Sequence, residues 1–205
     1  LFVEVNHGPF LVDNNIFLSE RALLDMSQGG AYAHNLVAGR SNLRPELSRS
    51  TPFHPAHSTS VAGLRPIEGG DDRFHNNIYV DGNGLSEYDV AVLPVRMSGN
   101  VFLRGATPSV HESSPLALAD FDPGVTLHAE GDAVYLRVAL DGAWRAEERC
   151  TLVTTEFLGL TRVSNLPYVQ PDDAPLRIDT DYLGAPRNAA HPYPGPFELP
   201  QGHDG

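Results

Sequence analysis

The stretch Asp72-Arg-Phe-His-Asn-Asn77-Ile-Tyr-Val80 decides the fold, because it places an asparagine directly before a short apolar run. The same design recurs in three other segments, whose asparagines are Asn15, Asn35 and Asn100. In chain order the four asparagines are separated by 20, 42 and 23 residues. A spacing near 21 is typical of the coils of a parallel β-helix. The middle gap then corresponds to two periods, with a degenerate or looped-out rung between them.

An asparagine at this position has a physical explanation. At the corner of each coil the backbone turns, often through a left-handed conformation that asparagine tolerates. Its side-chain amide can then hydrogen-bond to the same amide one rung above and one rung below. A leucine-rich repeat would carry far more leucine, and an antiparallel sandwich would show hairpin turns every 8 to 12 residues or so. The sequence therefore predicts an all-β chain, a right-handed parallel β-helix with the four asparagines on one corner.

Composition divides the chain into three parts. Residues 1–109 carry the repeat, and we expect them to form the β-helix coils. Within 110–165, the pair Gly131-Asp132 stands between two alternating runs, which is a hairpin signal, and residues 150–155 could add a third antiparallel strand. Residues 166–205 hold many prolines, and we expect an extended tail that packs on the β-helix.

Charge and composition exclude some classes of partner. The net charge is -12, and all 14 basic residues are arginine, so a polyphosphate would be repelled and no nucleic-acid partner is expected. No run reaches the roughly 18 apolar residues that a membrane-spanning helix needs. The chain starts at Leu1 inside an alternating run, without an initiator methionine. We therefore expect it to be the C-terminal part of a longer protein, whose cellular location this sequence does not indicate.

Two acidic residues, Glu4 and Asp25, lie 21 positions apart, which is one coil. Stacked strands lie about 4.8 Å apart. That distance is close to the roughly 5 to 5.5 Å between the two carboxyl groups of a retaining glycosidase. We expect Glu4 and Asp25 to stack or nearly stack, although two solvated acids beside turns would have the same spacing.

Histidines and a Gly-Gly-Asp-Asp-Arg segment supply further candidates. His7 and His57 lie in loops rich in small polar residues, where they could contact a substrate. Asp72 and Arg73 follow a glycine turn, and such a cluster can bind sugar hydroxyls through planar hydrogen bonds or form a structural ion pair at a corner. The sequence leaves both readings open. No His-x-x-x-His motif or cysteine pair predicts a zinc site, so no metal is expected.

Three segments of the chain share their pattern with a known family. They begin at Phe2 (Phe-Val-Glu-Val-Asn-His-Gly-Pro-Phe-Leu-Val-Asp-Asn-Asn-Ile), at Gly69 (Gly-Gly-Asp-Asp-Arg-Phe-His-Asn-Asn-Ile) and at Pro175 (Pro-Leu-Arg-Ile-Asp-Thr-Asp-Tyr). They resemble glycoside hydrolase family 120, bacterial β-xylosidases built on a right-handed parallel β-helix with an inserted β-sandwich. The likeness runs over nearly all of the chain, which would be about the last third of the family's length.

The resemblance implies a retaining, exo-acting glycosidase that releases xylose from xylobiose and xylooligosaccharides, without a metal or cofactor. It makes Glu4 the general acid/base and places the nucleophilic aspartate one coil earlier, upstream of this chain. Asp25 lies in a segment similar to that of the nucleophile and is expected in a neighbouring subsite or in the scaffold. With His7, His57, Asp72 and Arg73, it completes the expected substrate-binding set. A homo-oligomer is left open.

Two other functions remain as alternatives. A β-helix polysaccharide lyase would need calcium ligands or an arginine and lysine base set, whereas this chain has no lysine and only short acidic clusters. A non-catalytic carbohydrate-binding β-helix would present long uniform rungs. Here the rungs are interrupted by histidine-rich loops and a hairpin segment, which favours an enzyme.

Overall fold

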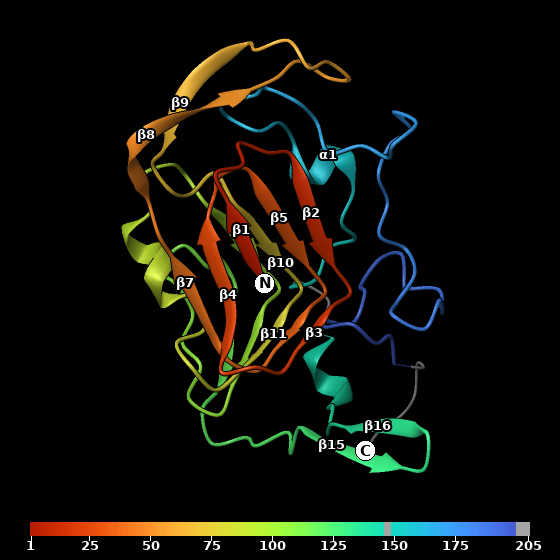
Figure 1. The fold of residues 1–205 in the computed structure, drawn as a ribbon. Helices are drawn as coiled ribbons and strands as arrows, with labels where there is room; N and C mark the ends of the chain where they lie inside the picture. Colours follow the sequence, from red (N-terminus) through yellow and green to blue (C-terminus); the bar gives the residue numbers. More distant parts are fainter. Residues whose placement is uncertain (146–148, 200–205) are drawn as a thin grey trace.

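The computed structural model describes residues 1–145 and 149–199, whose strands stack into successive coils around one axis (Figure 1). All strand pairs in the three main sheets are parallel. The first sheet contains β1 (Phe2–Glu4), β4 (Arg21–Met26) and β7 (Arg40–Leu43). The second contains β2 (Phe10–Asp13), β5 (Gly30–Ala33), β10 (Arg73–His75) and β12 (Arg96–Ser98). The third contains β3 (Ile16–Phe17), β6 (Leu36–Val37), β11 (Ile78–Val80), β13 (Val101–Leu103) and β14 (Leu116–Leu118). The predicted all-β parallel β-helix is confirmed.

The four asparagines form one continuous ladder along a corner of the coils. The backbone N–H of Asn15 donates to Asn35 Oδ1 at 2.9 Å. Both the backbone N–H and the side-chain amide of Asn35 donate to Asn77 Oδ1 at 2.9 Å. Asn77 repeats this pattern toward Asn100 at 2.9 and 3.0 Å. The ladder ends at Glu112, whose Oε2 accepts a hydrogen bond of 2.6 Å from Asn100 Nδ2. The prediction that these asparagines share a corner is confirmed.

The 42-residue gap is a single coil with an insertion, and the two-period interpretation is wrong. Asn35 bonds directly to Asn77, so no rung lies between them. The additional residues form an antiparallel hairpin of β8 (Glu46–Phe53) and β9 (Gly63–Ile67), which leaves the coil after β7. In Figure 1 this hairpin arches over the top of the sheets. The insertion therefore adds a wall beside the coils without adding a rung to the stack.

Aromatic side chains fill the interior of the coils. The rings of Tyr32 and Phe74 stack with centroids 4.7 Å apart. Tyr88 of the short helix η1 (Ser86–Val90) meets Phe74 edge-on at 4.6 Å. Tyr79 and Phe102 form a second stack at 5.4 Å. Offset and edge-on contacts are the favoured geometries of aromatic pairs, so the repeat of the backbone is also a repeat of the core.

The later part of the chain covers the outward sides of the strands. Successive residues of a strand point to opposite faces, so Ala31 and Ala33 face away from the interior residue Tyr32. Helix α1 (Thr155–Leu158) packs there through Leu158. The outward residues of β11 are covered by Tyr193 of the tail and by Trp144 of the short helix η2 (Gly142–Trp144). Both faces of these strands are therefore buried.

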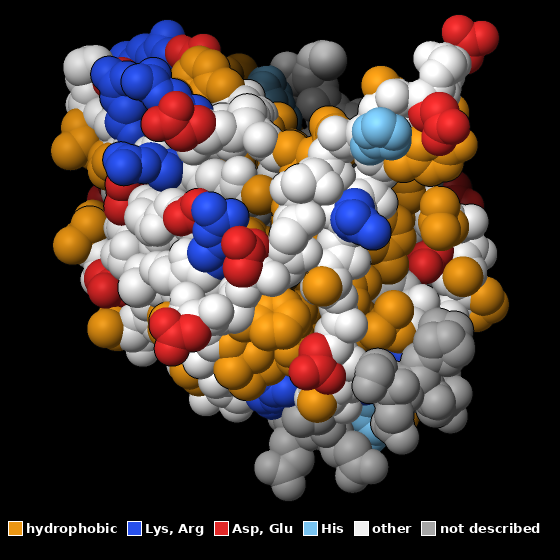
Figure 2. Space-filling view, turned by 90° about the horizontal axis from the view of Figure 1, so that it is seen from below, with side chains coloured by type: hydrophobic (Ala, Val, Ile, Leu, Met, Phe, Trp, Pro, Cys, Tyr) orange, Lys and Arg blue, Asp and Glu red, His pale blue; other side chains and the backbone are white. Residues whose placement is uncertain are grey.

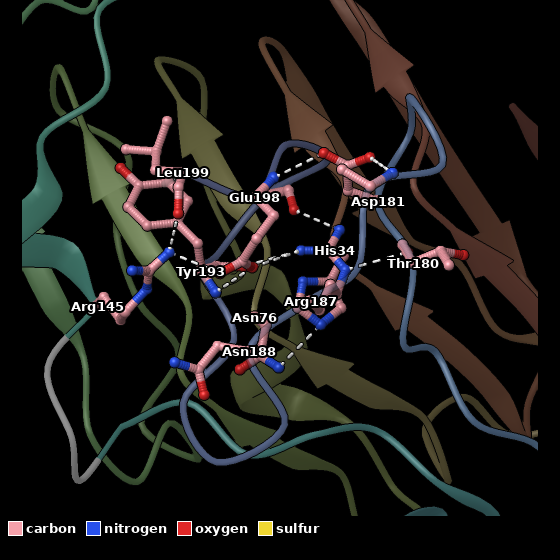
Figure 3. A network of polar contacts seen from close by, with 12 residues as sticks. His34, Asn76, Arg145, Thr180, Asp181, Arg187, Asn188, Tyr193, Glu198 and Leu199 are labelled. Carbon is pink, nitrogen blue, oxygen red and sulfur yellow. Dashed lines mark hydrogen bonds and ion pairs between the residues drawn. The ribbon is translucent and has the colours of Figure 1, made fainter. Parts of the chain in front are cut away.

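A buried arginine anchors the proline-rich tail, as Figure 3 shows. The guanidinium of Arg187 donates to Asn14 Oδ1 at 2.6 Å, and to the carbonyl oxygens of Tyr193 and Gly195 at 3.1 Å. It also lies 3.6 Å from the carboxylate of Glu198. Burial lowers the pKa of Arg187 to about 10, and the nearby carboxylates oppose that shift. One side chain thus joins the tail to the first coil.

The predicted hairpin at Gly131-Asp132 is present, formed by β15 (Thr126–Glu130) and β16 (Ala133–Arg137). It has two strands, because residues 150–155 do not join it and Thr154 makes only an isolated bridge to Arg177. β14 pairs with β13, so the β-helix ladder continues into the segment 110–165. The division into three parts stays a prediction, and residues 200–205 of its tail lie outside the described residues.

The surface carries both signs of charge. Figure 2, viewed from below Figure 1, shows acidic and arginine side chains interspersed on that face, with hydrophobic side chains gathered between them. Within the described residues, no helix is long and apolar enough to cross a membrane. The same part of the chain has no group of three or more His, Cys, Asp or Glu side chains placed to hold a metal ion.

Candidate functional site

A hollow of about 440 Å³ lies where β1 ends and the β8–β9 hairpin passes beside it. It brings together three of the residues predicted from the sequence, namely Glu4, His7 and His57. Phe53 and His54 of the hairpin, and Leu166 of the tail, are also among the residues that line it. The hollow is therefore built from the first coil on one side and from the insertion on the other.

Glu4 is the last residue of β1, and its carboxylate reaches the hollow. The carboxylate Oε1 lies 2.6 Å from the guanidinium of Arg49 on β8. About half of each side chain is exposed, 48% for Glu4 and 51% for Arg49. A carboxylate that is accessible and ion-paired at only one oxygen can still meet a ligand. Arg49 was not singled out by the sequence, because nothing in it indicated which residue of the insertion would lie opposite β1.

His7 is buried at the base of the hollow and is held on both ring nitrogens. A Gln28 amide N–H can only donate, so the contact of 2.8 Å makes His7 Nδ1 an acceptor. Nε2 therefore carries the proton and donates to the carbonyl oxygen of Thr51 at 3.1 Å. Burial lowers the pKa of His7, with the Thr51 hydrogen bond opposing the shift. The ring is thus neutral and fixed in orientation.

His57 lies on the rim, in the loop between β8 and β9. Its Nε2 is 2.7 Å from the carboxylate of Asp173 in the tail, 116 residues further along the chain. Both side chains are more than half exposed. The contact joins the tip of the insertion to the tail, and Asp173 is a second residue that sequence reasoning missed. Because 116 residues separate His57 from Asp173, no local pattern in the sequence indicates that they pair.

Asp25 lies inside the coil, away from the hollow. β1 pairs with β4 so that Val3 stands opposite Asp25 and Glu4 stands opposite Met26. Because a shift of one residue reverses the face, Asp25 points inward while Glu4 points outward. Its carboxylate is fully buried and accepts hydrogen bonds from Ser27 and, at 2.9 Å, from Tyr88. The expectation that Glu4 and Asp25 stack on one face is wrong.

Asp72 and Arg73 are also buried away from the hollow. Asp72 Oδ1 accepts the backbone N–H of Gly30 at 2.8 Å. The Arg73 guanidinium forms an ion pair of 2.8 Å with Asp71, and both side chains are more than nine-tenths buried. Arg73 also donates to the carbonyl oxygen of Leu158 at 3.2 Å. Of the two readings left open by the sequence, the geometry matches the structural ion pair at a corner.

The first coil leaves an unpaired end of the β-helix. β1, β2 and β3 each lie at the edge of their sheet. In the ladder, each coil donates to the asparagine of the following coil, and Asn15 Oδ1 accepts no hydrogen bond from the described residues. A second hollow, of about 590 Å³, lies across the first sheet, against β1, β4 and β7, and contains none of the predicted site residues. The two ends differ, since Glu112 occupies the other end of the ladder.

Comparison with known proteins gives one informative match. No family model matches the chain, and no curated protein matches it. A solved structure of XylC in complex with xylose matches with a TM-score of 0.87 and 39% sequence identity. The match covers 97% of this chain and 35% of XylC, so the chain spans about a third of the length of that protein. The chain therefore shares its β-helix, closely in fold and clearly in sequence, with a protein whose structure holds xylose.

Proposed function

We propose that this chain is the C-terminal part of a retaining β-xylosidase of glycoside hydrolase family 120, which releases xylose from xylobiose and xylooligosaccharides. One observation carries the proposal. Glu4 presents an accessible carboxylate in a hollow, on a β-helix that is 39% identical to a protein solved with xylose. The chain covers only 35% of XylC, so the proposed activity belongs to a longer protein that contains this β-helix.

In this proposal the nucleophile is an aspartate on a coil stacked against β1. The edges of β1, β2 and β3 are unpaired, and Asn15 Oδ1 offers an acceptor to such a coil. A residue one coil before Glu4 on the same face would lie about 4.8 Å from it. That separation fits the roughly 5 to 5.5 Å of a retaining pair better than the wider spacing of an inverting pair.

Glu4 has two tasks in this mechanism. It first donates a proton to the oxygen of the leaving group while the aspartate attacks the anomeric carbon, and it then removes a proton from the water that releases xylose. The ion pair with Arg49 fits the ionised form of Glu4, which acts in the second step. His7 lies at the base of the hollow as a neutral ring, so it offers no charge that would compete for the Glu4 carboxylate.

The test is the substitution Glu4→Gln in a protein that carries the preceding coil. Glutamine keeps the size of the side chain but removes the proton that a poor leaving group needs. Hydrolysis of xylobiose should fall by roughly 10² to 10⁴. An aryl xyloside with a good leaving group should form the covalent intermediate far more readily, and azide should restore its turnover.

Glu130→Gln is the matched control, because Glu130 is an exposed glutamate on β15 that does not line the hollow. It should leave both substrates unaffected. Equal losses on both substrates without azide rescue would remove Glu4 as the acid/base. Binding of xylooligosaccharide without turnover by the unaltered protein would favour a carbohydrate-binding module, and activity on polygalacturonate that a chelator abolishes would favour a lyase.

A further inference from the structure

The β8–β9 hairpin contributes nearly half of the hollow, and the proposed function uses little of it. Thr51 fixes His7, and Arg49 contacts Glu4. Phe53, His54 and His57 line the hollow beyond these two contacts. An aromatic ring among a few polar groups is the usual composition of a site for a small organic ligand.

The Phe53 ring is held in one place by its neighbours. Phe53 stands opposite Gly63 in the hairpin. A Cβ atom at Gly63 would lie 2.7 Å from two ring carbons of Phe53, so the ring rests directly on the glycine backbone. Its other neighbour is His7, whose ring meets it edge-on with centroids 6.0 Å apart. Phe53 is only partly buried, so part of the ring faces the hollow.

The loop that follows Phe53 is held at two points. His54 Nδ1 lies 3.0 Å from the carbonyl oxygen of Ser60, which closes the loop on itself. His57 bonds to Asp173, which ties the loop to the tail. The rim beside Phe53 therefore presents imidazole and carboxylate groups that can hydrogen-bond to hydroxyls.

We infer that the β8–β9 hairpin builds the leaving-group side of the site, with the Phe53 ring as the surface against which the leaving sugar lies. The inference rests on the proposed function. The nucleophile attacks the anomeric carbon from the side opposite the bond that breaks. A nucleophile on a preceding coil lies on one side of Glu4, whereas the hairpin is inserted two coils later, between β7 and β10, and closes the other side. A pyranose ring can place its C–H face on Phe53 and direct its hydroxyls to the rim.

The experiment compares two substrates that differ only in the leaving group. Xylobiose has a sugar that would contact Phe53, and β-xylosyl fluoride has a fluoride that would not. In a protein that carries the preceding coil, Phe53→Ala should lower kcat/KM for xylobiose by about tenfold or more and leave the fluoride unchanged. Phe53→Tyr should retain both activities. Gly63→Ala should mimic Phe53→Ala, because its methyl group displaces the ring.

Tyr135→Ala is the control, since this exposed tyrosine lies on the β15–β16 hairpin at the opposite end of the molecule in Figure 1. Thermal unfolding of each variant reports whether it is folded. Parallel losses on both substrates, or no loss on xylobiose from folded Phe53→Ala and Gly63→Ala, would overturn the inference. If the unaltered protein hydrolyses neither substrate, the proposed function fails and the inference falls with it.

Discussion

The two faces of the first sheet carry acidic residues with opposite environments. Glu4 points outward from β1, where it is half exposed and pairs with Arg49 at 2.6 Å. Asp25 points inward from the neighbouring strand β4, where it is fully buried and bonds to Ser27 and Tyr88. Glu4 and Asp25 thus have different partners although they lie nearly one coil apart in the sequence. A shift of one residue in the strand register places their side chains on opposite faces of the sheet.

The two inner acids, Asp25 and Asp72, both have raised pKa values. Burial raises the pKa of Asp25, against hydrogen bonds from Ser27 and Tyr88. Burial, and then the charge of Asp25, hold the pKa of Asp72 well above its ordinary value. The inner face therefore favours neutral, hydrogen-bonded groups that order the stack. The outer face leaves the carboxylate of Glu4 accessible, which the proposed acid/base role requires.

Removing an inner polar group should have the largest effect on stability. Asn77→Ala would leave the buried N–H of Asn35 without its acceptor and the carbonyl oxygen of Tyr32 without its donor. We expect the free energy of unfolding to fall by about 3 kcal/mol, measured by urea denaturation.

Asn15→Ala is the matched variant at the open end of the ladder. Among the described residues, the side-chain amide of Asn15 donates only to the carbonyl oxygen of Asp13, and we expect the free energy of unfolding to fall by about 1 kcal/mol. In a protein that carries the preceding coil, the loss in free energy of unfolding for Asn15→Ala should rise toward that for Asn77→Ala. If Asn15→Ala and Asn77→Ala lower the free energy of unfolding of this chain equally, the proposed difference between the end and the middle of the ladder is wrong.

A smaller effect on the free energy of unfolding is expected from neutralising an inner acid, and its size depends on pH. The folded-state pKa of Asp72 is raised, so the folded state binds more protons than the unfolded state between the ordinary and the raised pKa. Stability should therefore fall as pH rises through that window. Asp72→Asn removes this loss and should raise the free energy of unfolding by about 1 kcal/mol at pH 7.

Below the ordinary pKa of an aspartate, 3.8, Asp72→Asn should change the free energy of unfolding little, since both states are then protonated. Glu20→Gln, at an exposed outer acid, should stay within about 0.5 kcal/mol throughout the pH range. If Asp72→Asn instead lowers the free energy of unfolding more at pH 7 than in acid, the inner face stabilises the charged form of Asp72.

The smallest stability effect is expected on the outer face. Arg49→Gln breaks an exposed ion pair and should change the free energy of unfolding by less than about 0.5 kcal/mol. Arg177→Gln, in an exposed pair of 3.4 Å with Asp179, should behave alike. In a protein with the preceding coil, xylobiose turnover should fall about two- to tenfold for Arg49→Gln only, because Arg49 orients Glu4. Equal turnover of the two variants would remove Arg49 from the site.

The fold could be predicted because the asparagine ladder is local and repeated. Asn15, Asn35, Asn77 and Asn100 each precede a strand, and the corner they mark is the one observed. The length of the middle coil could not be predicted, since an inserted hairpin and a weak rung occupy the same number of residues. The direct bond from Asn35 to Asn77 and the pairing of β5 with β10 distinguish them.

The candidate site could be predicted only in part. His7 and His57 were identified by residue type and loop position, and Glu4 by its spacing from Asp25 and by the resemblance to a family. The three residues meet in one hollow. Asp25 was misplaced because the repeat is 22 residues between Phe2 and Leu24 but 20 between Phe10 and Gly30. A mean period near 21 therefore errs by one residue in the first sheet. The contact of Arg49 with Glu4 depends on how the inserted hairpin folds back over β1, and the spacing of residues in the sequence does not indicate this.

The bond between Asn35 and Asn77 also bears on how such proteins diversify. It is as short as its neighbours although 42 positions separate the two residues, so the hairpin inserted between β7 and β10 does not disturb the ladder. Lengthening, shortening or exchanging the β8–β9 hairpin would leave the register of every coil unchanged. The turn from β7 to β10 is thus a place where evolution, or a protein engineer, can graft a different wall beside the same carboxylate.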